Sequence, residues 1–267
     1  MPASVLITGG GSGIGAAIAR RMAAEGFDVC VMGRRREPLE AVAAEVGGIA
    51  FAGDTSDPEA TREAVAECIE RFGRLDGLAI SAGAGASGAV AEQTVERWNA
   101  VLQTNLTGAF LACRAALPHL VEARGAVVTV SSLAGLRADP QSAAYCASKA
   151  GLIMLTQCIA LDYGPHGVRA NCVCPGWIRT ALADAEMDAL AKRRGVDREA
   201  AYAVAVADVP ARRPGSAAEV AETVGWLLSA SAAYVNGAVV PVDGGTAIVD
   251  VGTLAFGSPA RSESEVK

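Results

Sequence analysis

A glycine-rich turn near the amino terminus constrains this chain more than any other stretch. Val5 to Ile7 is an apolar run, Thr8 to Gly15 is the turn, and residues 16–25 repeat apolar positions with the period of a helix. A strand, a glycine turn and a helix in this order form a unit in which the backbone approaches a phosphate and the helix start offers N–H donors. The alternative is a merely flexible turn. The arrangement predicts a dinucleotide site built from Gly9, Ser12, Gly13, Ile14 and Gly15.

The rest of the chain alternates strand-like and helix-like stretches. Short runs rich in β-branched residues predict further strands at 29–32, 49–53, 75–81, 126–130, 168–174 and 238–242. Apolar and amphipathic stretches between them predict helices that begin near 37 and span 58–72, 94–120, 143–163 and 216–230. This alternation predicts an α/β fold, a single Rossmann domain whose doubly wound parallel sheet has about seven strands with helices on both faces.

Two regions depart from that alternation. Residues 181–214 read as charged, alanine-rich helical pieces without a strand, and an insertion of this length predicts a substrate lid. Residues 258–267 form a polar tail that we expect to be frayed. We therefore expect one dinucleotide-binding and catalytic domain over 1–257, followed by the tail.

The composition excludes several other classes of protein. An excess of 29 acidic over 23 basic residues gives a net charge of −6, which disfavours binding to nucleic acid. No run of about 18 apolar residues is free of charge, and the first residues read as a strand rather than a signal peptide, so we expect a cytoplasmic protein without a membrane partner. The seven cysteines lack Cys-x-x-Cys spacing and lie mostly in apolar stretches, which predicts buried free thiols and no metal site.

Three arginines follow the second predicted strand. Arg34, Arg35 and Arg36 lie where a carboxylate would bind the adenine ribose of NAD. Cations at a helix start oppose the helix dipole unless an anion lies among them, and a ribose 2′-phosphate would be that anion. We therefore expect NADP(H) in preference to NAD(H), with Arg34 and Arg35 as contacts. A solvated basic corner is the alternative, and it leaves NAD(H) possible.

Loops after the later strands supply further candidate cofactor contacts. Asp54 and Thr55 follow the third strand, where Asp54 could accept a hydrogen bond from the adenine amino group. Alternatively, Asp54 or Asp57 caps the next helix, and Asp57 is the better cap because Pro58 suits the first helical position. Small residues follow the fourth strand, and a Pro-Gly pair ends the sixth, so a cofactor could lie against the backbone at both places. The candidate contacts are Ser81, Ala82, Gly83, Pro175, Gly176, Ile178 and Thr180.

Four polar residues are candidates for catalysis. Tyr145 and Lys149 are four residues apart, which on a helix is about 40° of rotation and roughly 6 Å of rise, so they share a face. An ammonium one turn from a phenol favours the phenolate and lowers its pKa. Ser132 follows the fifth strand at the same edge of the sheet, and Asn105 lies in an apolar stretch, where a buried amide must be hydrogen bonded. A chance pairing of Tyr145 and Lys149 is the alternative.

Taken in order and at these spacings, the motifs resemble the short-chain dehydrogenase/reductase family from residue 3 to about 247, and its single-domain 3-oxoacyl reductase-like branch in particular. The resemblance implies that Tyr145 is the general acid/base and that Ser132 orients and polarises the substrate oxygen. It implies that Lys149 lowers the pKa of Tyr145 and holds the nicotinamide ribose, while Asn105 supports a water-linked proton relay. The implied reaction is hydride transfer between a nicotinamide and a secondary alcohol or ketone.

The chain departs from the family pattern at two positions. Ser81 replaces a usual Asn, which predicts an altered backbone-bracing hydrogen bond, and His166 replaces an Arg that docks an acyl carrier protein in fatty-acid-synthesis reductases, which disfavours that partner. We expect Ser132, Tyr145 and Trp177 to contact a small-molecule substrate. The resemblance also implies a homo-oligomer, a tetramer or dimer, packed through helices 94–120 and 143–163. A catalytically silent, cofactor-sensing regulator on the same fold is the alternative function.

Overall fold

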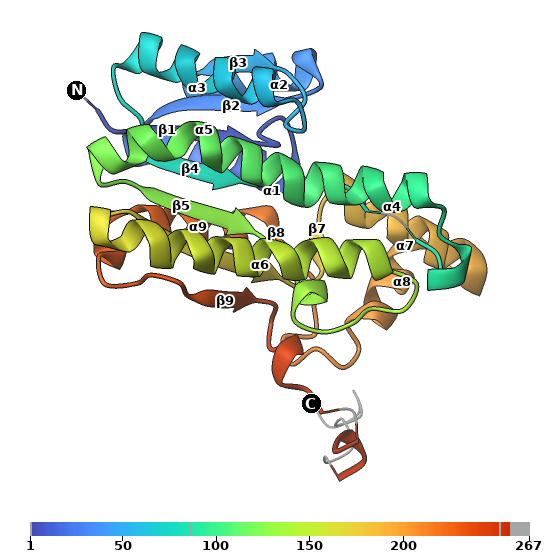
Figure 1. The fold of residues 1–267 in the computed structure, drawn as a ribbon. Coiled ribbons are helices and arrows are strands. Elements are labelled where there is room, and N and C mark those ends of the chain that lie inside the picture. Colours follow the sequence, from blue (N-terminus) through green and yellow to red (C-terminus); the bar gives the residue numbers. More distant parts are fainter. Residues whose placement is uncertain (1, 86, 251, 257–267) are drawn as a thin grey trace, which may run out of the picture.

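Seven parallel strands form the centre of the structure, a computed structural model that describes residues 2–85, 87–250 and 252–256 (Figure 1). Their order is β3-β2-β1-β4-β5-β6-β9, so the order reverses between β1 and β4. This confirms the predicted doubly wound sheet and puts its ligand crevice beyond the carboxyl ends of those two strands. The strands are β1 Ser4–Thr8, β2 Asp28–Gly33, β3 Ile49–Ala52, β4 Gly77–Ile80, β5 Ala126–Val130, β6 Arg169–Pro175 and β9 Val239–Val242.

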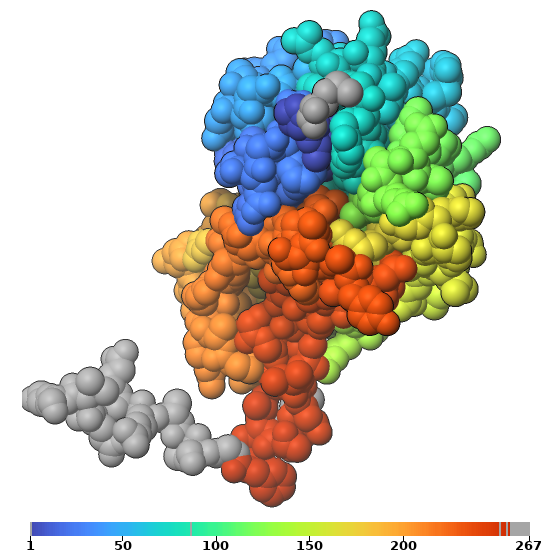
Figure 2. Space-filling model, turned by 90° about the vertical axis from the view of Figure 1, so that its left-hand side faces the viewer, coloured from blue at the N-terminus to red at the C-terminus, as the bar shows by residue number. Residues whose placement is uncertain are grey.

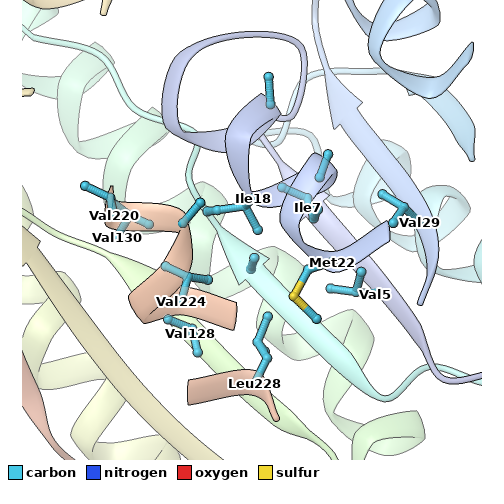
Figure 3. Close-up of a cluster of buried hydrophobic side chains, with 14 of the residues drawn as sticks. Val5, Ile7, Ile18, Met22, Val29, Val128, Val130, Val220, Val224 and Leu228 are labelled. Carbon is cyan, nitrogen blue, oxygen red and sulfur yellow. The ribbon is translucent and has the colours of Figure 1, made fainter. Parts of the chain in front are cut away.

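Helices cover both faces of the sheet. Side chains of α1, α2 and α9 form the core on one face, and those of α3, α5 and α6 form it on the other. Figure 3 shows the first core, where Ile18 and Met22 of α1 pack near Val224 of α9. Burial on both faces explains why the strands read as continuous apolar runs. The helices are α1 Gly13–Ala24, α2 Arg36–Val46, α3 Pro58–Phe72, α4 Val95–Leu102, α5 Gly108–Ala123, α6 Ala143–Tyr163, α7 Ala181–Arg194, α8 Arg198–Ala205 and α9 Ala217–Leu228.

The long helix predicted over 94–120 is interrupted. A π-helical turn, Gln103–Thr107, separates α4 from α5 and turns Asn105 inward, where it is fully buried. Immediately after this turn, Gly108 packs on the backbone of Thr55, and a Cβ at Gly108 would lie 3.1 Å from the Thr55 carbonyl oxygen. Wide turns of this kind within helices are frequent at functional sites. Apolar periodicity does not reveal them, because the apolar positions on either side still fit a helix.

The insertion between β6 and α9 contains α7 and α8, as the helical pattern of residues 181–214 predicted. These helices share a small core of their own around Met187 and Tyr202. Two short parallel strands, β7 Ile178–Arg179 and β8 Gly215–Ser216, pair at the base of the insertion. The sequence did not predict this pair, because two residues are too few to show strand periodicity.

The last described residues form an extension. Residues 246–250 and 252–256 project from the body of the molecule (Figure 2). The predicted tail at 258–267 lies outside the described residues.

All seven cysteines are unpaired, as expected, but two of them are not buried. Cys146 is half-buried and Cys158 is exposed on α6, because that helix presents one side to solvent.

Within the described residues no group of three or more His, Cys, Asp or Glu side chains is arranged to hold a metal ion. Residues Ala143–His166 are long and apolar enough to cross a membrane, with a mean hydropathy of 1.3, but 44% of that segment is buried against the rest of the fold.

We expect Asn171→Ala to destabilise the fold strongly. Asn171 is fully buried on β6, its Nδ2 donates to the Val235 carbonyl at 2.9 Å, and its Oδ1 accepts from Ala238 N at 3.0 Å. Truncation leaves both backbone partners unsatisfied, so the free energy of unfolding should fall by about 2–4 kcal/mol. Urea unfolding measures this, with Asn99→Ala on exposed α4 as the control. A loss no larger than that of the control would show that Asn171 does not secure β9.

Candidate active site

One cavity of about 590 Å³ opens at the carboxyl edge of the sheet and runs from the glycine turn to the start of α6. Its volume lies in the range of small-molecule sites, roughly 300–1,000 Å³. The predicted residues that line it are Gly9, Ser12, Gly13, Ile14, Gly15, Arg34, Arg35, Asp54, Thr55, Ser81, Ala82, Gly83, Tyr145, Lys149 and Thr180. The predicted residues that do not line it are Asn105, Ser132, Pro175, Gly176, Trp177 and Ile178.

The glycine turn packs backbone to backbone against the turn after β4. Gly9 has φ of 68°, and a Cβ there would lie 2.7 Å from the backbone nitrogen of Ala82. The Thr8 hydroxyl accepts from the backbone N–H groups of Ser81 at 3.2 Å and Ala82 at 3.3 Å. Thr8 thus braces the turn in which Ser81 replaces the usual Asn. The sequence did not single out Thr8 for this role, although its place at the end of β1 is the signal.

The start of α1 faces the cavity without a side-chain cap. Ser12 is the N-cap residue, but its hydroxyl makes no capping hydrogen bond and instead accepts from Arg35 Nη2 at 3.2 Å. The first N–H groups of α1 therefore remain available to an anion such as a pyrophosphate. A cradle of bare glycine backbone next to an uncapped helix start fits a dinucleotide, as the sequence predicted.

Two of the three consecutive arginines line the cavity. Arg34 and Arg35 form no ion pair with any described residue, whereas Arg36 pairs with Glu40 at 3.4 Å on the outer face of α2. Arg34 is close enough to Asp54 that its charge contributes to the lowered pKa of that carboxyl. Two unpaired guanidinium groups at the rim of a dinucleotide cradle are a donor set suited to a phosphate monoester.

Asp54 has a local structural role. Its pKa is lowered mainly because its Oδ1 accepts from Ser56 N at 2.9 Å, and the Ser56 hydroxyl adds a second hydrogen bond at 2.8 Å. Asp57, the better of the two predicted caps, is the N-cap residue of α3, and its carboxylate accepts a hydrogen bond from Glu59 N at 2.9 Å. Asp54 still lines the cavity, but one of its carboxylate oxygens is already engaged in the turn.

Tyr145 and Lys149 lie on the first turns of α6, at the opposite end of the cavity from the arginines. The Lys149 side chain is almost fully buried, and its Nζ donates to the Val130 carbonyl at the end of β5 at 2.8 Å. Nζ is 5.7 Å from the centre of the Tyr145 ring. The Ser131 hydroxyl donates to the Lys149 carbonyl at 2.8 Å and fastens α6 to β5. Sequence reasoning missed Ser131, although it stands beside Ser132.

The pKa values of this pair correct one expectation. Burial lowers the pKa of Lys149 to about 8, and burial is also the main reason that the pKa of Tyr145 is raised rather than lowered. The Ser132 hydroxyl opposes the rise for Tyr145, whereas the carboxylates of Glu186 and Asp139 add to it. Lys149 is not among the groups that shift the phenol pKa, and its ammonium donates instead to the Val130 carbonyl.

Asn105 holds the turn after β4 against α6. Its Oδ1 accepts from Ala84 N at 2.7 Å, and its Nδ2 donates to the Ala84 carbonyl at 2.9 Å and to the Ser148 hydroxyl at 3.0 Å. Ser148 in turn donates to the Tyr145 carbonyl at 2.8 Å. The expectation of a buried, satisfied amide is met. Sequence reasoning missed Ser148, which is fully buried next to Lys149.

The loop after β6 supports the cavity mainly from outside. Thr180 caps α7 and lines the cavity opposite Gly13. In contrast, Ile178 is buried in β7. The backbone N–H of Gly176 donates to the Val242 carbonyl at 3.1 Å. Trp177 was predicted to contact substrate, but it lines a separate cavity of about 80 Å³ near Asp243 and packs toward the core of α7 and α8. The reason is the short β7–β8 pairing, which holds this loop against the insertion.

Comparisons with known proteins cover nearly the whole chain. A family profile described as "Enoyl-(Acyl carrier protein) reductase" matches residues 9–247. Protein MoaE of Klebsiella aerogenes is 44% identical over 256 residues, 94% of this chain and 98% of that protein. Meso-2,3-butanediol dehydrogenase of Serratia marcescens is 34% identical over 249 residues, 92% of this chain and 95% of that protein.

A solved structure agrees with these matches. An actinorhodin polyketide ketoreductase variant, solved with NADPH, has a TM-score of 0.89 and 33% identity, covering 93% of this chain and 98% of that one. The fold, the order of the motifs and the matches thus point to one family. The chain belongs to the short-chain dehydrogenase/reductase family.

Proposed function

We propose that this protein is an NADP(H)-preferring oxidoreductase that transfers a hydride between a nicotinamide and a secondary alcohol or ketone, with Tyr145 as general acid/base. The observation that carries the proposal is the single cavity that joins the glycine turn and Arg34 to Tyr145 and Lys149. Two similar proteins, a meso-2,3-butanediol dehydrogenase and an actinorhodin polyketide ketoreductase, have names that indicate this class of reaction.

The chain would hold the coenzyme at three places along this cavity. The uncapped start of α1 and the glycine turn would hold the pyrophosphate, and Arg34 with Arg35 would hold a ribose 2′-phosphate. Lys149 lies under the turn after β4, since its Nζ is 3.5 Å from the place of a Cβ on Gly83, and it would bind the ribose next to the nicotinamide. When bound, the coenzyme supplies or accepts a hydride at its nicotinamide ring.

Tyr145 would move the proton that accompanies the hydride. In ketone reduction its phenol donates a proton to the carbonyl oxygen, and in alcohol oxidation the phenolate takes that proton back. The Ser132 hydroxyl, which interacts with the phenol, would donate a hydrogen bond to the same oxygen. A phenol is protonated at neutral pH, so Tyr145 would enter ketone reduction as the proton donor.

We further propose that α7 and α8 act as a lid. Leu182 of α7 lines the cavity, so movement of this helix pair would open the substrate end or exclude water from it.

We also propose that the protein is cytoplasmic. Its seven cysteines are unpaired, which is typical of proteins in a reducing compartment.

A homo-oligomer is a further part of the proposal. The sides of α5 and α6 that face away from the sheet expose large apolar side chains, Phe110 at 47%, Met154 at 59% and Leu161 at 78%. The two helices lie side by side on one face of the molecule (Figure 1). An apolar surface of this kind favours association with a second copy.

Tyr145→Phe should abolish turnover while preserving coenzyme binding. The variant keeps the ring but lacks the proton donor, so kcat/KM for a ketone should fall about a thousandfold. NADPH oxidation with a panel of ketones measures this, and NADPH fluorescence reports binding. Tyr163→Phe, at the other end of α6, is the control. If the wild type binds NADPH but converts no ketone or alcohol, and Tyr145→Phe changes nothing, the protein is a cofactor-sensing regulator instead.

Arg34→Ala should weaken NADPH binding about tenfold or more and leave NADH binding nearly unchanged, because only NADPH carries the phosphate. Titration of both coenzymes by calorimetry measures the two dissociation constants. Arg36→Ala is the matched control, since Arg36 is paired with Glu40 outside the cavity. Equal weakening of both coenzymes, or a wild-type preference for NADH, would contradict the assignment of a phosphate site.

Charge on the apolar face of α5 and α6 should split the assembly. We expect light scattering to give a dimer or tetramer mass for the wild type and a smaller mass for the double variant Phe110→Glu/Met154→Glu, since two carboxylates cannot be buried unpaired. Val196→Glu, an exposed apolar position after α7, is the control. A monomeric wild type, or a variant with unchanged mass, would rule out this interface.

A further inference from the structure

Two consecutive residues, the last of β5 and the one after it, hold Lys149 at both of its ends. The Lys149 Nζ donates to the Val130 carbonyl at 2.8 Å, and the Lys149 carbonyl accepts from the Ser131 hydroxyl at 2.8 Å. Ser131 and Lys149 are each 4% exposed, and both line the cavity. The backbone N–H of Ser131 donates to the Val173 carbonyl of β6 at 2.8 Å, which ties Ser131 itself to the sheet. We call the hydrogen bonds of Val130 and Ser131 with Lys149 the lysine clasp, because they fix both the ammonium and the backbone of one residue.

The turn that carries Ser132 packs on the lysine clasp. Gly135 ends this turn, and a Cβ there would lie 2.8 Å from Ser131 Oγ and 2.9 Å from the carbonyl oxygen of Lys149. Contacts this close leave no room for a side chain, so the turn rests directly on the Ser131 hydroxyl and on the backbone of α6. The Ser131 hydroxyl thus lies between the turn that carries Ser132 and the helix that carries Tyr145.

A second hydroxyl contact joins β5 to α6 away from the cavity. Thr129 Oγ1 and Thr156 Oγ1 are 2.7 Å apart, both residues are fully buried, and neither is among the residues that line the cavity. Thr156 is seven residues after Lys149, about two helical turns. This contact holds the middle of α6 on the sheet independently of Ser131. Loss of the Ser131 hydroxyl should therefore disturb the start of α6 without releasing the helix.

We infer that Ser131 is a positioning residue for the reaction. It directs the Lys149 ammonium, and it sets the separation between Ser132 and Tyr145. The inference rests on the proposed oxidoreductase function and adds a residue that acts through groups already assigned to it. A lysine has a flexible four-carbon stem, so a hydrogen bond to its ammonium alone does not fix the path of the stem. With the backbone anchored as well, the stem is confined between two neighbouring residues of the chain. Such confinement matters because a misplacement of about 1 Å can cost about a hundredfold in rate.

The first measurement locates the Lys149 ammonium and needs no turnover. The chain has three lysines, Lys149, Lys192 and Lys267, so acylation of each by an N-hydroxysuccinimide ester can be followed by mass spectrometry of its peptide. Buried Lys149 should react slowly in the wild type, and exposed Lys192 is the internal reference. In Ser131→Ala the ratio of the Lys149 rate to the Lys192 rate should rise about tenfold, the equivalent of one hydrogen bond.

The second measurement is catalytic. With NADPH and a ketone that the wild type reduces, Ser131→Ala should lower kcat about tenfold or more and change KM for the ketone little, since the reacting groups are misplaced but the cavity remains. Thr156→Val is the matched control, because it removes a buried hydroxyl from the same strand–helix contact and should leave both measurements at their wild-type values. If Ser131→Ala does not fold, Ser131→Cys replaces it, since a thiol is a weak donor of similar shape.

The outcomes separate this inference from the proposed function. Unchanged labelling of Lys149 in folded Ser131→Ala, or unchanged kcat in that variant, overturns the inference and leaves the oxidoreductase assignment intact. Equal effects in Thr156→Val also overturn it, because Ser131 would then only stabilise the fold. If the wild type converts no ketone or alcohol, the proposed function fails, and labelling decides the inference together with the dissociation constant of NADPH. Faster labelling with weaker NADPH binding supports the inference, and the absence of either change overturns it.

Discussion

The contact on which this structure depends is the one between the turns after β1 and β4. A side chain at Gly9 would collide with the backbone of Ala82, and the Thr8 hydroxyl is shared by the N–H groups of Ser81 and Ala82. The turn after β4 continues to Ala84, which Asn105 holds from both sides, and Asn105 reaches Ser148 beside Tyr145. A series of contacts therefore links the glycine turn to the backbone of Tyr145 at the other end of the cavity.

Electrostatics at the catalytic end reflect burial more than pairing. The Lys149 ammonium donates to one carbonyl and has little contact with solvent, so its pKa falls to about 8. Desolvation raises the pKa of Tyr145, and the carboxylates of Glu186 and Asp139 add to the rise. The cavity thus has unpaired guanidinium groups of Arg34 and Arg35 near the glycine turn and the buried ammonium of Lys149 beside Tyr145.

Much of the fold and part of the site follow from local pattern. The strand and helix periods predict the α/β alternation, Asp57 and Pro58 mark the start of α3, and glycine spacing locates the turn that lines the cavity. The brace at Thr8, the hydrogen bonds of Ser131 and Ser148, and the position of Trp177 could not be predicted in this way. Each depends on a partner far away in the chain, and sequence periodicity carries no information about which distant residues meet.

The sequence by itself determined the chemical groups and their order: a bare glycine turn, three arginines, and a phenol and an amine one helical turn apart. Local geometry fixed these features, because hydrogen bonds within a helix and steric limits at glycine act over a few residues. Only the tertiary structure decided that Arg34 and Arg35 face the cavity while Arg36 does not, that Lys149 is directed to Val130, and that Asn105 reaches Ser148. Those outcomes depend on burial and on charges brought together from separate elements, and desolvation exists only once the chain has packed.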